Sequence, residues 1–249
     1  MMQSLEKPMD VPAQVVGTHS ISHMRWLVAI LVGVVGAWLL FQYPPIRYDI
    51  PERLKSVTMF SSQELIAEYF DAQNDVYRKN SFADLTLVGT CFGASALLIS
   101  RGLKPWHNLI ALAIGAFCGS IAAYFALYMS PYLIHRFRLP FADDSSQAMV
   151  SETMLFIGCS TIMVLPFASS LWLHGCPVQK RAAMILPMSG VLTGIVAPIT
   201  ISAFFPMEPT HHFPPNGSIV CTIWIAILGA AIFFVSSHRK RQPKTTTAP

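Results

Sequence analysis

Few residues of this chain are able to do chemistry, and most of them stand beside long apolar runs. Asp84 and Glu152 each precede such a run, while His211 and His212 are adjacent in the proline-rich stretch "MEPTHHFPPNGS". Two carboxylates at the mouth of a passage would select or gate a solute, and paired imidazoles would bind a metal if further ligands joined them. A carboxylate at a helix N-terminus is also stabilised there without any further role. We therefore keep Asp84 and Glu152 as a candidate pore mouth and interpret the histidine stretch as a turn.

Three cysteines extend the search into the apolar runs. Cys91, Cys118 and Cys159 each fall about 12 Å below one boundary if every residue advances a helix by about 1.5 Å. Thiols at one depth would suit a soft metal, but cysteine is also an ordinary small apolar residue in helix interiors. No nucleotide-binding, zinc-protease or serine-hydrolase motif is present. We predict no catalytic residue, no metal site and no cofactor, and we do not expect an enzyme.

The elements that carry these residues are apolar helices. The chain of 249 residues is 53% hydrophobic and only 12% charged, against about 25% charged residues in an average soluble domain. A helix needs about 20 mostly apolar residues to cross the hydrocarbon core. The predicted fold is all-α, a polytopic bundle of six transmembrane spans. These spans cover about 26–43, 83–100, 107–130, 150–173, 182–205 and 217–237.

The apolar cores of the six spans contain no Asp, Glu, Lys, Arg or His. Ionisable side chains inside a membrane are unfavourable, and they mark proton relays and ion pathways. An intramembrane protease or a proton-coupled carrier is therefore not expected.

Charge placement predicts the orientation. The connections "RGLKP" and "CPVQKR" are basic, whereas "MEPTHHFPPNGS" has no Lys or Arg, so the positive-inside rule places both termini in the cytoplasm. We predict a multi-pass protein of the plasma (inner) membrane in three parts. A flexible cytoplasmic lead (1–24) precedes a membrane domain (25–237) with an exported segment (42–84), and a basic tail (238–249) follows. That tail suits lipid headgroups and not nucleic acid.

The exported segment contains a predicted amphipathic helix over about 61–80. Ser61 and Glu64 are spaced as a capping box, and four acids are spaced along one face. These acids are Glu64, Glu68, Asp71 and Asp75. Three interpretations stay open: a helix lying on the membrane or on the bundle with solvated acids, a surface that docks a partner, or a cation site.

Glycines four residues apart indicate where helices approach closely. Three spans contain G-x-x-x-G, which allows close backbone packing in lipid. The pairs are Gly89 with Gly93, Gly115 with Gly119, and Gly190 with Gly194. By helix rise, Gly93 and Gly115 lie about 15–16 Å deep and Gly89 and Gly119 about 10 Å deep. We predict that spans two and three form a closely packed antiparallel hairpin.

Prolines interrupt spans four and five. Pro166, Pro187 and Pro198 remove backbone donors, and nearby Ser and Thr hydroxyls are able to satisfy the freed carbonyls. Such helices either pack against each other or frame a passage for a neutral solute.

Residues 159–194, "CSTIMVLPFASSLWLHGCPVQKRAAMILPMSGVLTG", resemble the fourth and fifth spans of six-span membrane anti-sigma factors in their Cys, Pro and Gly placement. The resemblance covers about a seventh of the chain. It implies a sigma-binding segment in the cytoplasmic lead, and "MMQSLEKPMDVPAQ" departs from that pattern.

The function expected from these patterns is a non-enzymatic scaffold or regulatory partner in a membrane complex. Its partners would be the lipid bilayer and another membrane protein, or further copies of itself. The alternative is a channel or uncoupled permease for a small neutral solute between spans four and five. A redox component that binds a metal or haem is the third hypothesis.

Overall fold

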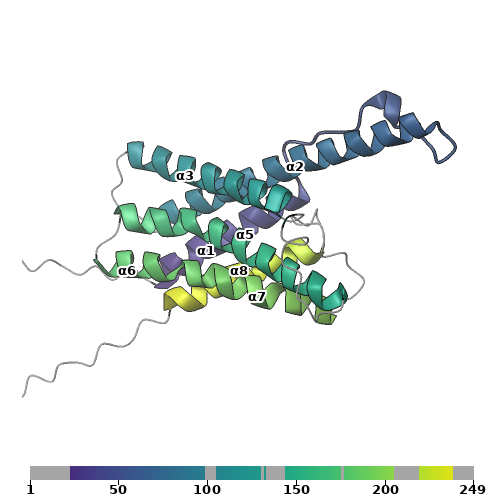
Figure 1. Cartoon of the computed structure of the whole chain (residues 1–249). Helices are drawn as coiled ribbons and strands as arrows, with labels where there is room; N and C mark the ends of the chain where they lie inside the picture. The colour runs from purple at the N-terminus through teal and green to yellow at the C-terminus, as the bar shows by residue number, and fades with distance from the viewer. Residues whose placement is uncertain are drawn as a thin grey trace, which may run out of the picture.

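The structure, a computed structural model, describes residues 23–98, 105–129, 132, 144–174, 177–204 and 219–237. Every element within this part of the chain is helical, and no strand occurs there. Figure 1 shows the helices side by side in a bundle. The elements are α1 (His23–Gln42), η1 (Glu52–Leu54), α2 (Gln63–Leu97), α3 (Pro105–Tyr124), η2 (Phe125–Met129), α5 (Asp144–His174), α6 (Pro177–Ile185), α7 (Pro187–Phe204) and α8 (Ile219–Ser237).

Four helical stretches are long and apolar enough to cross a membrane. They are Met24–Gln42, Pro105–Met129, Glu152–Leu173 and Lys180–Phe204. The apolar part of α8, Val220–Val235, is shorter. This confirms the predicted all-α bundle of membrane helices, whereas the count of six spans goes beyond these four.

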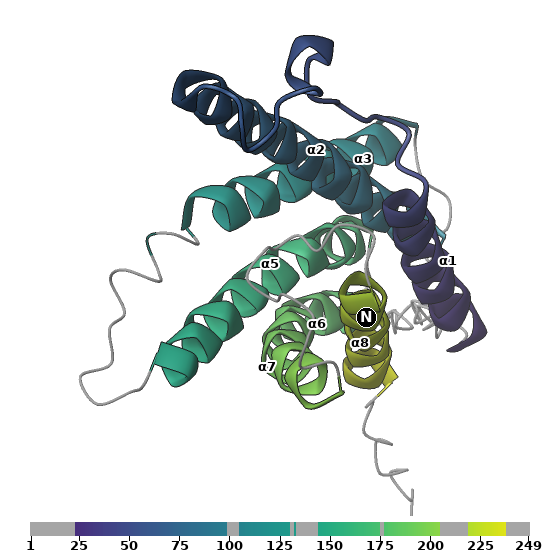
Figure 2. The same cartoon turned by 90° about the vertical axis from the view of Figure 1, so that its right-hand side faces the viewer.

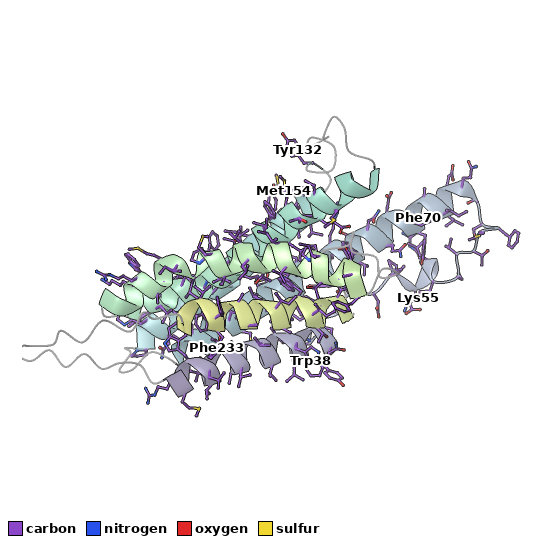
Figure 3. The ribbon with its side chains drawn as sticks, turned by 90° about the horizontal axis from the view of Figure 1, so that it is seen from below. Trp38, Lys55, Phe70, Tyr132, Met154 and Phe233 are labelled. Atoms are coloured by element: carbon purple, nitrogen blue, oxygen red, sulfur yellow. The ribbon has the colours of Figure 1, made fainter. Side chains whose placement is uncertain are left out.

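The outer surface of the bundle is apolar, as lipid contact requires. Trp38 on α1 and Phe233 on α8 lie at the surface of the bundle (Figure 3), and both are exposed. Apolar side chains are exposed along the whole of α1: Met24, Leu27, Val28, Leu31, Val32, Val35, Trp38 and Leu39. A contiguous surface of this kind is rare on soluble proteins, and it fits a helix that faces hydrocarbon.

The structure corrects the prediction for residues 61–100. The amphipathic helix (61–80) and the second span (83–100) are not separate elements, because α2 runs without a break from Gln63 to Leu97. Hydrophobicity changes sharply near Asp84, but the intervening residues Ser81, Phe82 and Ala83 include no Gly or Pro that would stop a helix. A change from polar to apolar residues therefore does not mark a helix end here.

The fifth predicted span (182–205) matches the apolar stretch Lys180–Phe204, but the structure divides it into two helices. α6 ends at Ile185 and α7 begins at Pro187, with Leu186 as a turn between them. Proline suits the first position of a helix, where its missing N–H would have no partner in any case. The carbonyl of Leu186 accepts hydrogen bonds from the backbone N–H and the side-chain hydroxyl of Ser189, at 2.8 and 2.6 Å.

Neighbouring helices pack antiparallel, and side-chain contacts fix their directions. Gly36 of α1 approaches Cys91 of α2, while Gly33, earlier on α1, approaches Ser95, later on α2. The same logic applies to α1 and α8, where Trp38 bonds Thr222 and Val34 meets Gly229. Figure 2 shows α7 and α8 nearly end on, with α2, α3 and α5 running obliquely across the view.

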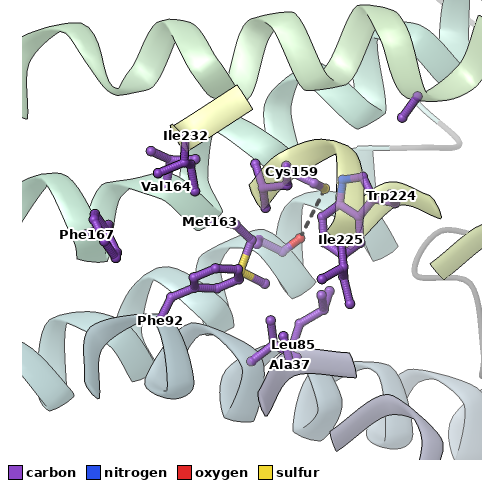
Figure 4. Packing of buried hydrophobic residues seen from close by; sticks show 14 of the residues in the cluster. Ala37, Leu85, Phe92, Cys159, Met163, Val164, Phe167, Trp224, Ile225 and Ile232 are labelled. Atoms are coloured by element: carbon purple, nitrogen blue, oxygen red, sulfur yellow. Dashed lines mark hydrogen bonds between the residues drawn. The ribbon is translucent and has the colours of Figure 1, made fainter. Parts of the chain in front are cut away.

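The interior is filled by aromatic, sulfur and small aliphatic side chains from α1, α2, α5 and α8 (Figure 4). Trp224 of α8 is fully buried, and its indole N–H donates to Ser160 Oγ of α5 at 2.9 Å. Trp224 also meets Phe41 of α1 edge to face. A buried indole needs such a partner, so this bond sets how α8 is rotated against α5.

Candidate functional site

Residues 63–80 of α2, here called the stalk, project beyond the ends of the other helices (Figure 1). α2 has 35 residues; by helix rise it is about 52 Å long, of which the stalk accounts for about 27 Å. The hydrocarbon core of a bilayer is only about 30 Å thick, so α2 is longer than a single crossing needs. The stalk is thus an extension of the bundle, and it does not lie across the bundle surface.

The cap at the start of the stalk differs from the prediction. Ser62, and not Ser61, is the N-cap, and its hydroxyl accepts a hydrogen bond from the Leu65 N–H at 3.4 Å. The Ser61 hydroxyl instead accepts from the Thr58 N–H at 3.0 Å. The predicted capping box of Ser61 with Glu64 was therefore wrong, because the hydroxyl of Ser61 is used by the preceding turn and the next serine caps the helix.

Residues 43–62 return alongside the stalk and are held at its foot by polar contacts. Asn80, a buried residue of α2, accepts from the Tyr48 N–H at 2.8 Å and donates to the Tyr48 carbonyl at 3.0 Å. One turn further, the Asp84 carboxylate lies 3.6 Å from the Arg47 guanidinium. Two consecutive residues of this segment are thus bound to two residues on one face of α2. We call these four residues the latch.

A second set of contacts holds the same segment nearer the tip of the stalk. Leu54 of η1 is buried, and the neighbouring Arg53 forms an ion pair with Glu68 of the stalk. Lys55 donates to Glu52 at 2.7 Å, and this hydrogen bond raises the pKa of the lysine. The segment and the stalk together form one packed unit.

The four acids predicted as a partner surface fall into two groups. Glu68 is paired with Arg53, and Asp75 is paired with Lys79 at 2.8 Å. Glu64 and Asp71 are exposed and have no ion-pair partner among the described residues. The same part of the chain contains no group of three or more His, Cys, Asp or Glu placed to hold a metal.

Aromatic and basic side chains gather where the stalk meets the bundle. The Arg78 guanidinium lies 5.9 Å from the centre of the Tyr128 ring, and Tyr128 packs against Tyr124 with ring centres 4.6 Å apart. A hydrogen bond to Asp75 raises the pKa of Lys79, and burial raises that of Tyr77. Aromatic rings with Lys and Arg are typical of the membrane–water interface.

The two residues of the candidate pore mouth lie in different surroundings. Asp84 has a side chain that is only 2% exposed, and its Oδ1 has no hydrogen-bond partner among the described residues. Its charge is opposed by Arg47, which the sequence did not single out. Glu152 is partly buried on α5.

The glycines of spans two and three lie against the facing helix backbone. A methyl group on Gly89 would come 2.7 Å from the Cα of Gly119, and one on Gly93 would come 2.7 Å from the carbonyl oxygen of Ala111. A methyl group on Gly115 would lie 2.6 Å from the Gly89 oxygen. α2 and α3 therefore touch backbone to backbone, in antiparallel order.

The third glycine pair places α7 against α5. A methyl group on Gly190 would meet Thr161 N at 2.6 Å, and one on Gly194 would meet the side chain of Ile157 at 2.6 Å and its Cα closer still. The hydroxyls of Thr193 and Thr200 donate to the carbonyls of Ser189 and Val196 on their own helix, both at 2.8 Å. At these levels α5 and α7 are in direct backbone contact.

Sequence reasoning missed other small residues that pack equally closely. A methyl group on Gly36 would lie 2.6 Å from Cys91 Sγ, and one on Gly158 would lie 2.6 Å from Cζ of the Phe125 ring and closer still to Cε1. These glycines do not stand in G-x-x-x-G, so spacing alone does not mark them. Their partners lie on other helices, and only the packed bundle brings the residues together.

The cysteines lie in different helix interfaces. Cys91 Sγ lies 3.9 Å from the Gly33 carbonyl of α1, and Cys159 Sγ donates to the Ala122 carbonyl of α3 at 3.7 Å (Figure 4). Each thiol fills a narrow contact between helices, as a small apolar side chain would. The adjacent histidines His211 and His212 lie outside the described residues.

The chain matches no known protein family, and no curated protein or solved structure matches it either. The resemblance of residues 159–194 to anti-sigma factors is therefore not accompanied by a family match.

Proposed function

We propose that this protein is a non-enzymatic scaffold or regulatory partner in a membrane complex, and that the stalk is its contact surface outside the cytoplasm. The uninterrupted course of α2 carries the proposal. Because the stalk is continuous with a helix packed in the bundle, a partner bound to it would be held at a defined height and orientation. The segment 43–62 stiffens the stalk further through the latch and through the ion pair of Arg53 with Glu68.

We further propose six spans with both termini in the cytoplasm of a cell with a plasma (inner) membrane. The antiparallel contacts support alternating crossings by α1, α2, α3, α5, α6 with α7, and α8. If the four long apolar stretches cross in this way, α2 would bring the chain back across the membrane between α1 and α3. α8, antiparallel to α1, would be the last crossing. The stalk then lies outside, opposite the basic connections.

The close contact of α5 with α7 supports the scaffold role over the alternative of a solute passage between these helices. Backbones that touch at Gly190 and Gly194 leave no space for a solute at those levels. We therefore place the channel or uncoupled permease second.

The proposal is tested by native mass spectrometry of the tagged chain, released from its own membranes in a mild detergent. We expect a complex that contains at least one different protein in a fixed ratio. A lone protomer or a homo-oligomer would contradict the scaffold role. Proteoliposomes of the purified chain provide the second measurement: release of a small neutral solute above that of empty vesicles would favour the channel.

A further inference from the structure

The tip of the stalk carries a rigid turn whose two corner residues are apolar. In this tip turn, residues 58–61, the Ser61 N–H donates to the Thr58 carbonyl at 3.0 Å and the Thr58 N–H donates to Ser61 Oγ at 3.0 Å. The Phe60 N–H lies 3.4 Å from Thr58 Oγ1. Met59 and Phe60 occupy the corners and are 94% and 99% exposed. The backbone is thus fixed while two large apolar side chains are fully presented to the surroundings.

The height of the tip turn excludes contact with the bilayer that holds the bundle. The stalk separates Met59 and Phe60 from the Asn80 level by about 27 Å of continuous helix. Figure 3 shows Phe70 and Lys55 on this projecting part, well away from Trp38 and Phe233 on the bundle. With α2 crossing the bilayer as proposed, the stalk thus carries the tip turn away from the lipid of the same membrane.

The charge around the tip is acidic and favours a basic partner. Residues 52–71 contain four acids and two bases. Both bases are paired, Arg53 with Glu68 and Lys55 with Glu52, so the excess negative charge rests on Glu64 and Asp71. An opposing bilayer with anionic headgroups would be repelled by this charge, whereas Lys or Arg on a protein would complement it.

A second copy of the chain fits this surface poorly. Leu65 and Phe70, the exposed apolar residues of the stalk nearest the tip, are about 140° apart around the helix and form no shared seam. Two tips that met head on would each cover only one side of Met59 and Phe60, far below the roughly 800 Å² per partner of a stable interface. A pocket, in contrast, would enclose both side chains and exclude water around them.

We propose that Met59 and Phe60 form the anchor by which this chain binds a folded extracytoplasmic protein that offers an apolar pocket rimmed by Lys or Arg. This inference rests on the proposed function and adds to it the binding residues and the chemistry of the partner. Aromatic and methionine side chains are typical anchors of this kind, and a turn that is already ordered loses little entropy on binding.

The test places the photo-crosslinking residue p-benzoylphenylalanine at position 60 of the full-length chain, in living cells. We expect one ultraviolet-dependent product that contains an exported protein. The same residue at Gln73, an exposed position on the middle of the stalk, should yield at least fivefold less of it. A product with a second copy, a product with lipid alone, or no product would overturn the inference.

Charge-reversal variants in the same cells test whether the partner's pocket has a basic rim. Glu64→Lys combined with Asp71→Lys should lower the yield at position 60 at least fivefold, because both unpaired acids become bases. Asp49→Lys, next to the residue held at the foot of the stalk, should leave the yield within twofold. An unchanged yield in the double variant would contradict the basic rim and with it the proposed partner chemistry.

A last comparison separates this inference from the scaffold role. Phe60→Ser removes the anchor without loss of packing, because Phe60 contacts almost nothing in the chain. If Phe60→Ser still co-purifies with the partners of the natural chain, the scaffold role stands and the anchor is refuted. If the natural chain itself has no partner, the scaffold role is refuted first.

Discussion

Asn80 and Asp84 lie one helical turn apart on α2 and bind two consecutive residues of the returning segment, Tyr48 and Arg47. The side-chain amide of Asn80 accepts from the Tyr48 N–H and donates to the Tyr48 carbonyl. It thus satisfies both backbone polar groups of Tyr48, as an adjacent β-strand would. Buried polar groups of a main chain need such partners. The latch therefore holds the beginning of the segment 43–62 at the foot of the stalk.

Replacing Asn80 by Ala should release that segment. The change removes two hydrogen bonds at a partly buried site, a net loss of about 1–3 kcal/mol, which corresponds to roughly 5- to 150-fold more of the open form. Limited trypsin digestion at Arg47, Arg53 and Lys55 in membranes should accelerate by that factor. Asn74→Ala, at an exposed position of the same helix, is the control. Equal digestion rates in both variants would show that the latch does not hold the segment.

The pairing of Arg47 with Asp84 leads to a separate prediction. Arg47→Gln leaves the Asp84 carboxylate, only 2% exposed, without its opposing charge, and removal of one partner of a buried pair is more harmful than removal of both. We expect Arg47→Gln to lower the thermal midpoint in detergent, and Arg47→Gln with Asp84→Asn to restore most of the loss. The midpoints of the single and double variants measure this. A double variant less stable than Arg47→Gln would refute the pairing argument.

At the scale of elements, the contact between α2 and α3 depends on the absence of side chains. Gly89 and Gly119 let two backbones touch, and in lipid this close packing replaces the hydrophobic effect as the force that joins helices. Backbone contact at glycines also joins α5 to α7. The bundle is thus held by two such contacts, with larger side chains such as Trp224 and Phe92 filling the space between them.

Gly89→Ala should separate α2 from α3. The added methyl group would collide with backbone atoms of Gly115 and Gly119, which cannot rotate away as a side chain can, and such overpacking costs about 1–3 kcal/mol. The unfolding midpoint in a denaturing detergent titration should fall accordingly. Ala94→Leu adds more atoms at an exposed position of the same helix and should change the midpoint little. If the two variants behave alike, the close contact does not stabilise the bundle.

At the scale of the whole molecule, alternating helix directions give the proposed topology. α2 is antiparallel to α1 and to α3, and α8 is antiparallel to α1. An even number of crossings returns the C-terminus to the side of the N-terminus, which is the side of the basic connections.

Single cysteines in a chain cleared of its natural ones test this topology. Met59→Cys and Asn216→Cys should react with a membrane-impermeant maleimide in intact cells. Gly102→Cys and Lys240→Cys should react only after the membrane is permeabilised. Labelling of Gly102→Cys in intact cells would show that α2 does not cross and would reduce the count of spans. Labelling of all four variants in intact cells would mean that the cells were leaky, so a cytoplasmic protein serves as the integrity control.

Composition and residue spacing were enough to predict the helical class, the apolar stretches and the glycines by which α2 and α3 touch. These are local properties, because apolar run length and residue spacing along a helix do not depend on the rest of the fold. Residues such as Gly158 and Trp224 were beyond this reasoning, since their partners lie 33 and 64 residues away on other helices.

What the sequence by itself determined is that the chain forms long apolar helices and which helix faces are small enough to touch. Only the tertiary structure showed that the predicted amphipathic helix and second span form one continuous helix. It also showed that Arg47 pairs with Asp84 and that Asn80 binds Tyr48. Hydropathy reports the solvent around a residue and not the continuity of its backbone. Contacts between residues more than 30 positions apart exist only once the chain has folded back on itself.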